Sequence, residues 1–314
     1  MSAVEPTMGA PAPTAPHPPM PAAELQLARA LIYITPVLWS VNYLVARWAP
    51  DIVAPHALAL GRWTIAALVL AAFCWRELWT QRALIRAEWR QSIVLGALGM
   101  WICGAFVYIG GRSTTAVNMG LVYAVSPVLI ALGSALWLRE RVRAAQVVGV
   151  ALALTGMLHI LLRGDWSALA RLQFNPGDIW IAAATLSWTA YSLLLRAWPS
   201  AFGAVARLTL TACGGIVVLV PFTVWEALYW LPTEVSWRSV GLVTASALIP
   251  GAGAFAAYSY MQKRLGAARV AQVLYLSPLY TALIGWGVLG ERIELHHGLG
   301  AMLILPGLWL STRR

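Results

Sequence analysis

Two short clusters of polar and aromatic side chains lie inside long apolar runs of this chain. Trp39 and Asn42 are three residues apart in the first cluster, and Trp188 and Tyr191 have the same spacing in the second. Residues three apart share one face of a helix, so each pair predicts one face able to contact a small molecule. An amide surrounded by hydrocarbon is costly unless it is paired. Asn42 is therefore expected to face a protein interior and to bond either a neighbouring helix or a polar ligand.

Further aromatic residues recur in the middle of the apolar runs. Trp101 and Tyr108 are seven residues apart, which places them two turns from each other on one helical face. Such rings can either line a cavity or fill a core, and both interpretations stay open for each of them. Tryptophans near the ends of the runs, such as Trp75 and Trp89, are more typical of a membrane-interface belt. The residues expected to contact a bound molecule are Trp39, Asn42, Tyr43, Trp101, Tyr108, Tyr123, Trp188, Tyr191, Tyr258 and Tyr275.

Two prolines interrupt apolar runs at similar places. Pro127 and Pro278 each follow a serine in the middle of a run. Proline cannot donate the usual backbone hydrogen bond, so each helix is expected to kink and to leave carbonyl groups open. Kinks at matched positions would suit a gate, and static shaping of a helix bundle is the alternative.

Four charged residues near the ends of the runs are expected to be structural. Arg62 and Arg207 could bind a carboxylate with two parallel bonds. Their position a few turns inside the runs favours snorkelling to the interface or capping of neighbouring carbonyls. Glu140 and Glu291 each precede an arginine, so exposed ion pairs at turns are expected there.

The elements that hold these residues must cross a membrane. Of 314 residues, 60% are hydrophobic and 11% are charged, whereas soluble domains have roughly 25% charged residues. A helix of ~20 apolar residues spans the hydrocarbon layer. We therefore expect an all-α, polytopic membrane protein. Its ten transmembrane helices are expected near 31–48, 54–75, 92–111, 115–138, 144–162, 178–197, 204–226, 239–261, 267–289 and 297–311.

Basic residues lie in short clusters between the apolar runs. With the N-terminus inside, the inside segments hold fourteen of the 22 Lys and Arg residues and the outside segments hold six. The positive-inside rule then predicts a multi-pass protein of the bacterial inner membrane with both termini cytoplasmic. This pattern also explains the net charge of +10 without nucleic-acid binding. Residues 1–26 are rich in Pro and Ala near their start and lack an apolar signal-peptide core, so they are expected to form a disordered tail.

The two halves of the chain resemble each other. A shift of 151 residues places Ser126-Pro127 on Ser277-Pro278 and Glu140 on Glu291. The same shift places Gly149 and Gly156 on Gly300 and Gly307, and a shift of 145 pairs Arg62 with Arg207. A unit of five spans is odd in number, so the second copy must enter from the other side of the membrane. Residues 27–162 and 178–314 are therefore expected to form two inverted five-helix repeats, joined by a periplasmic connector at 163–177. Inverted repeats are typical of transporters.

Several of these motifs together resemble the EamA-type family of the drug/metabolite transporter superfamily. They are the Trp-Ser-x-Asn of the first span, the arginine early in the second, Ser-Pro in the fourth and ninth spans, and Glu-Arg after each of those spans. The resemblance covers about residues 30–311 and implies export of amino acids or other small metabolites. The abundance of aromatic residues makes the chain most similar to bacterial aromatic amino-acid exporters.

Three functions are compatible with a polytopic membrane protein of this kind. The first is a secondary transporter that exports amino acids, aromatic or large neutral ones, by alternating access. The second is an exporter of another metabolite class, such as nucleobases, sugar derivatives or drugs. A membrane enzyme is disfavoured because no nucleophile–base constellation is evident. The expected partners are a small-molecule substrate and the lipid bilayer, without nucleic acid, and a monomer is compatible with the sequence.

The predicted spans lack residues that two kinds of site would need, a proton-exchanging carboxylate and a metal site. No Asp or Glu lies deep within a predicted span, so a buried proton-exchanging carboxylate for cationic drugs has no candidate. The pair His296-His297 has only Glu291 and Glu294 nearby, so no metal site is expected. No cofactor is expected either.

Overall fold

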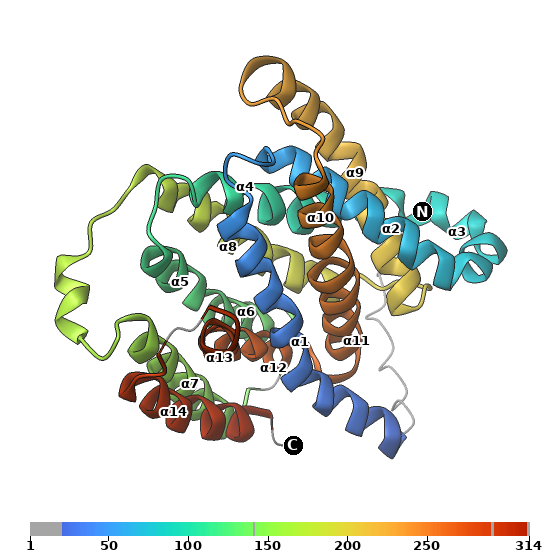
Figure 1. The fold of residues 1–314 in the computed structure, drawn as a ribbon. Coiled ribbons are helices and arrows are strands. Elements are labelled where there is room, and N and C mark those ends of the chain that lie inside the picture. The colour runs from blue at the N-terminus through green and yellow to red at the C-terminus, as the bar shows by residue number, and fades with distance from the viewer. Residues whose placement is uncertain (1–20, 141, 290–291, 313–314) are drawn as a thin grey trace, which may run out of the picture.

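The computed structural model describes residues 21–140, 142–289 and 292–312, and this part of the chain is helical without strands. Within it, nine helical segments are long and apolar enough to cross a membrane. A tenth helix, α14 (Leu295–Thr312), packs along α7 (Ala144–Leu161). The fold is therefore the expected all-α bundle (Figure 1).

Each half of the chain supplies the same order of helices. In the first half, α1 (Ala22–Trp48) and α7 are continuous, and α2 (Pro55–Thr80) is kinked at Cys74, whose backbone is not helical. The third span is α3 (Arg82–Gly96), η1 (Ala97–Ile102) and α4 (Cys103–Gly110), and the fourth is α5 (Ala116–Ala124) and α6 (Ser126–Leu136). In the second half, α8 (Pro176–Ala197), α9 (Ala204–Tyr229) and α14 are continuous. Its third span is α10 (Trp237–Ser246), η3 (Ala247–Ala254) and α11 (Phe255–Leu265), and its fourth is α12 (Ala267–Ala271), η4 (Gln272–Leu276) and α13 (Ser277–Leu289).

Two boundaries differ from the sequence expectation. The first helix begins at Ala22, so residues 22–26 are helical and do not belong to a disordered tail, while residues 1–20 lie outside the described part. The basic stretch around Arg76–Arg90 is also helical, because α2 runs to Thr80 and α3 starts at Arg82. Charged residues in a helix are no barrier to its continuation once it leaves the hydrocarbon layer.

Repeat-related helices pack against each other in opposite directions. At the start of α2, His56 contacts Glu226 near the end of α9, and late in α2 Cys74 contacts Thr209 near the start of α9. In the same way Gly149 of α7 lies opposite Gly307 of α14, and Gly156 lies opposite Gly300. Since α2 matches α9 and α7 matches α14 in the repeat, these antiparallel pairs show that the two halves are inverted.

The interruptions of the helices are matched as well. The third span of each half contains a π-helical segment, η1 and η3, and the fourth span of each half breaks just before its Ser-Pro pair. Segments of π- and 3₁₀-helix are frequent at functional sites and hinges. The two repeats therefore share their irregular backbone segments as well as their regular helices.

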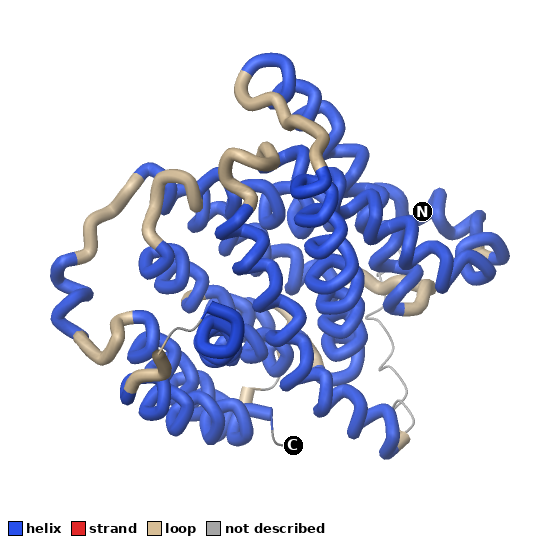
Figure 2. Tube along the Cα trace, in the orientation of Figure 1, coloured by secondary structure: helices blue, strands red, loops and turns tan. Residues whose placement is uncertain are grey.

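Both described ends of the chain lie on one face of the bundle. We call the face where α1 begins and α14 ends the terminal face (Figure 1). Glu24 pairs with Arg264 there at 2.9 Å, and Glu140 pairs with Arg196 at 3.1 Å. The opposite face carries the α1–α2, α4–α5 and α9–α10 connections, and also the loop between α7 and α8 with its short helix η2 (Trp166–Arg171) (Figure 2).

Candidate functional site

A cavity lies between the two halves and is open toward the opposite face. Its empty volume is about 860 Å³, and it adjoins a wider hollow of about 1700 Å³. Asn42, Val107, Tyr123 and Met157 line both spaces. The inner cavity is lined by Trp39, Asn42, Arg62, Trp63, Gly99, Cys103, Gly104, Val107, Tyr123, Met157, Trp188, Phe255, Leu274 and Ser277. The wider hollow reaches Arg163, Arg292, Glu294, His296 and His297.

The polar centre of this cavity is the side chain of Asn42. Its Oδ1 accepts hydrogen bonds from the Tyr108 hydroxyl at 2.7 Å and from Nη1 of Arg62 at 3.2 Å. The three residues come from α1, α4 and α2, so the amide joins three spans. Asn42 therefore has the interhelical bonds that the sequence left open, and it also lines the cavity.

Arg62 lies in the cavity, which corrects the expected snorkelling or capping role. The residue is 5% exposed, and its Nε has no partner among the described residues. Its guanidinium lies 5.1 Å from the Trp63 ring and 5.8 Å from the Phe255 ring. It makes no ion pair within the described part of the chain. The cavity thus contains a buried cation bonded to a neutral amide.

Arg207 makes the bonds expected of a helix cap. Its Nη1 donates to the Leu195 carbonyl at 2.8 Å and its Nη2 donates to the Trp198 carbonyl at 2.9 Å. These carbonyls lie at the end of α8, where the last turn leaves such groups unpaired. The repeat-related arginines therefore have different surroundings in this conformation.

Aromatic rings close the cavity toward the terminal face. Trp39 lies 5.7 Å from Trp188 and 5.4 Å from Tyr258, and Trp188 lies 5.4 Å from Tyr191, measured between ring centroids. Tyr191, Tyr258 and Tyr275 are fully buried. The hydroxyl of Tyr258 contacts that of Ser192 at 3.0 Å. Tyr191 and Tyr258 lie against Trp188, and we call these three rings the aromatic layer. None of the three tyrosines lines the cavity, contrary to the substrate contacts expected of them.

Trp101 also lies outside the cavity. Its ring stacks on Phe222 of α9, with centroids 4.0 Å apart. Trp101 lies two residues after Gly99, so it occupies a different face of the third span from the residues that line the cavity. The cavity wall of the third span consists instead of Gly99, Cys103, Gly104 and Val107. Tyr108 reaches the site only through Asn42.

The remaining expected residues fall into three groups. Pro127 and Pro278 lie in the first turn of α6 and α13, so each starts a new helix after the break; Pro278 also lines the wider hollow. Glu140 accepts a bond from Arg196 at 3.1 Å, whereas Arg141, the adjacent arginine expected to pair with it, lies outside the described residues. Glu291 and the side chain of Tyr43 lie outside the described residues.

Several residues of the cavity wall are not predicted by the sequence. Trp63 and Phe255 line the cavity with the small residues of α4, and their centroids are 4.8 Å apart. Trp63 directly follows Arg62, which was the available signal. Phe255 had none, because its place at the cavity depends on its contacts with Trp39 and Trp63 of other spans.

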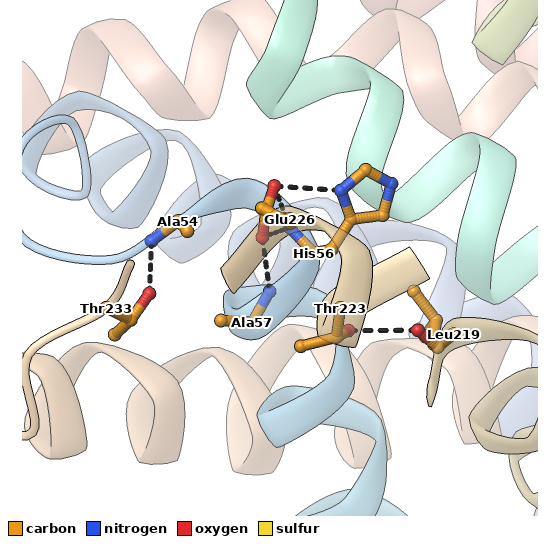
Figure 3. Close-up of polar contacts among 7 residues, drawn as sticks. All are labelled: Ala54, His56, Ala57, Leu219, Thr223, Glu226 and Thr233. Atoms are coloured by element: carbon orange, nitrogen blue, oxygen red, sulfur yellow. Dashed lines mark hydrogen bonds and ion pairs between the residues drawn. The ribbon is translucent and has the colours of Figure 1, made fainter. Parts of the chain in front are cut away.

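A buried carboxylate near the opposite face was also missed. Glu226 of α9 is fully buried, and it accepts bonds from the backbone N–H groups of His56 and Ala57 at 2.9 and 3.1 Å (Figure 3). The ring Nδ1 of His56 lies 2.8 Å from the other carboxylate oxygen. The carboxylate therefore caps the N-terminus of α2, a position that favours negative charge.

A second cap lies at the other end of this helix pair. Glu77 near the end of α2 accepts a bond from the Gly203 N–H at the start of α9 at 2.5 Å. Each helix of the pair thus caps the other. Both glutamates lie near helix ends, so neither provides a carboxylate in the middle of a span.

The fold and the cavity define a polytopic membrane transporter with inverted repeats. The model of the EamA-like transporter family matches residues 27–162 and 175–313, and the chain belongs to this family.

Similar proteins cover nearly the whole chain. The uncharacterized transporter YyaM of Bacillus subtilis is 24% identical over 279 residues, which are 88% of this chain and 90% of the relative. A probable terminal-alkyne amino-acid exporter of Streptantibioticus cattleyicolor is 25% identical over 298 residues, 92% of this chain and 95% of the relative. A crystal structure with 22% identity has a TM-score of 0.73 and covers 91% of this chain and 96% of that one, which shows the fold.

Proposed function

We propose that this transporter exports aromatic or large neutral amino acids across the bacterial inner membrane by alternating access. The observation that carries the proposal is the buried Arg62 guanidinium in an aromatic cavity, without a carboxylate partner among the described residues. Arginine binds carboxylates in a bidentate manner, and such bonds are strong where water is excluded. A ligand carboxylate would supply the charge that the cavity lacks.

The other walls fit the rest of an amino acid. The rings of Trp39, Trp63 and Trp188 offer an apolar surface for a large side chain. Their faces also attract an ammonium group, which has no carboxylate to bind in this cavity. A cationic drug is disfavoured because it would meet the positive charge of Arg62 without compensation.

The cavity is open through the wider hollow on one face and closed by the aromatic layer toward the other, which corresponds to one conformational state of a transport cycle. With the terminal face in the cytoplasm, as the distribution of basic residues favours, the cavity faces outward in this conformation. Exchange between two such states is the mechanism that inverted repeats support. The similarity to an amino-acid exporter of Streptantibioticus cattleyicolor supports the same substrate class.

Exchange in proteoliposomes tests this proposal. Vesicles loaded with phenylalanine or tryptophan should take up the labelled amino acid, and phenethylamine, which lacks the carboxylate, should compete poorly. Arg62→Gln should lower the exchange rate at low substrate by about tenfold or more, because a charge-assisted bond is lost. The matched control is Arg171→Gln, an exposed arginine paired with Asp165 in the connector.

The result can also favour the other metabolite classes. Exchange of nucleobases or sugar derivatives, with no exchange of any amino acid, would contradict the proposal. Equal competition by phenylalanine and phenethylamine would remove Arg62 from substrate recognition.

A further inference from the structure

A separate hollow opens at the terminal face. Its empty volume is about 1870 Å³, and the ends of α8 and α11 and the start of α9 line it. It shares no lining residue with the central cavity. The layer of Trp188, Tyr191 and Tyr258 separates the two spaces. We call this hollow the terminal vestibule.

Arg207 is the repeat-related counterpart of Arg62 and lines the terminal vestibule. Both of its hydrogen bonds go to neutral carbonyls, and it makes no ion pair in the described part of the chain. A guanidinium has five N–H donors, so the two caps leave donors for a further acceptor. Arg207 can therefore bind an anion without releasing the end of α8.

A residue with an unpaired amide oxygen lines the same vestibule. Gln262 of α11 is 2% exposed, and its Nε2 donates to the Ser192 carbonyl at 2.9 Å. This bond fixes the orientation of the amide, and its Oε1 then has no partner among the described residues. A buried acceptor without a donor costs free energy that a ligand donor would recover.

The vestibule thus has the same pair of groups as the central cavity, an arginine and an amide oxygen. In the cavity these are Arg62 and Asn42, and in the vestibule they are Arg207 and Gln262. A carboxylate and an ammonium group are the complementary partners of such a pair. Lys263 lies in the vestibule as a further positive charge, whereas Arg196 and Arg264 are paired with Glu140 and Glu24.

We infer that Arg207 and Gln262 form a second binding site for a zwitterionic amino acid in the terminal vestibule. Arg207 binds the carboxylate and Gln262 Oε1 accepts from the ammonium group. The inference rests on the proposed function for its substrate class. It adds a site on the other side of the aromatic layer, where a substrate is held before the central cavity opens to that face.

A cysteine reporter can detect occupancy of this site. Ala204 lines the vestibule three residues before Arg207, on the same face of α9. Ala204→Cys is placed in a chain in which Cys74 and Cys213 are replaced by serine. Cys103 is kept because it lines the central cavity, and the same chain without Ala204→Cys gives the background labelling. The purified protein in detergent, with both faces accessible, is labelled with a charged maleimide. Phenylalanine should slow labelling, and phenethylamine should not.

The variants decide where the protecting ligand binds. Arg207→Gln should raise the phenylalanine concentration needed for protection by about tenfold or more. Gln262→Ala, which leaves the caps made by Arg207 intact, should also weaken protection. Arg62→Gln is the matched control and should leave protection within about twofold of the parent, because its arginine lies beyond the aromatic layer. Monodisperse elution checks that each variant is folded.

The opposite pattern would overturn the inference. Loss of protection in Arg62→Gln with retention in Arg207→Gln would mean that the reporter senses the central cavity from a distance. A parent that exchanges phenylalanine without any protection would remove the second site and leave the proposed function intact. A parent that shows neither exchange nor protection would contradict both.

Discussion

Arg62 and Arg207 show how one residue type takes two roles in matched positions. Arg207 reaches two carbonyls at the end of α8, whereas Arg62 bonds the amide of Asn42 and faces the cavity. At position 191, which matches Asn42, the second repeat has a tyrosine. The second repeat therefore has the arginine but not the amide that binds it in the first repeat. The neighbouring groups decide whether the arginine faces a cavity or caps a helix.

Trp39 and Trp101 are expected to respond differently to mutation. Trp39 lines the cavity, so Trp39→Ala should raise the half-saturation concentration for phenylalanine exchange by about tenfold. Trp101 stacks on Phe222 outside the cavity, so Trp101→Phe should keep that value within about twofold. Concentration dependence of exchange in proteoliposomes measures both. A large rise for Trp101→Phe would place its ring in the substrate path.

Glu226 is expected to contribute to stability. Glu226→Ala leaves the N–H groups of His56 and Ala57 buried without an acceptor, so the free energy of unfolding should fall by about 3 kcal/mol. Thermal unfolding of the purified protein measures the change. The control is Glu234→Ala, because Glu234 is exposed. An unchanged melting temperature for Glu226→Ala would show that this cap contributes nothing to stability.

Glycines allow the backbones of helices α7 and α14 to approach each other closely. A Cβ at Gly149 would lie 2.4 Å from the Gly307 carbonyl oxygen, and one at Gly156 would lie 2.7 Å from that of Gly300. Small residues allow this approach, and lipid-embedded helices associate through such packing. The repeated glycines thus hold the fifth span of one half against the fifth span of the other.

Two glycines of α14 provide a matched test of this packing. A Cβ at Gly300 would lie 2.3 Å from Cγ1 of Ile160, whereas one at Gly298 would have no neighbour within 4 Å. Gly300→Ala should lower the free energy of unfolding by about 1–3 kcal/mol. Gly298→Ala should leave it unchanged or raise it by up to ~1 kcal/mol, since alanine favours a helix. Equal melting temperatures for the two variants would contradict the close contact.

The helices of the fourth span in each half break before Pro127 and Pro278. Each proline lies in the first turn of a helix, and because it has no backbone N–H, a carbonyl of the preceding turn lacks its usual donor. Movement at these breaks during transport stays a prediction from the matched sequence positions.

The whole molecule presents its two described ends on one face. The segments that the sequence assigns to the side of the N-terminus hold fourteen basic residues and the segments on the other side hold six, so both termini should be cytoplasmic. A reporter that is active only in the periplasm, fused to either end, should give no signal, and the same reporter inserted in the connector near Trp166 should be active. Activity at either terminus would reverse the orientation or change the number of spans.

The sequence by itself determined the membrane class, the helical spans and the inverted repeat. The length of each apolar run and the constant offset between Ser126-Pro127 and Ser277-Pro278 can be found in the sequence alone. Neither depends on which residues contact each other in the folded protein. The candidate site could be predicted only in part. Trp39, Asn42, Tyr123 and Trp188 line the cavity, and their contact with a substrate stays a prediction.

Only the tertiary structure decided the other members of the site. Trp101 lies on the face of the third span that meets Phe222 of α9, whereas Gly99 and Cys103 face the cavity. The spacing of residues shows which of them share a face, but not which face of a helix turns toward a cavity. Arg62 faces the cavity and Arg207 caps α8 because their neighbours come from distant spans. The mutual caps by Glu77 and Glu226 form for the same reason, since each needs the end of a helix that lies far away in the sequence.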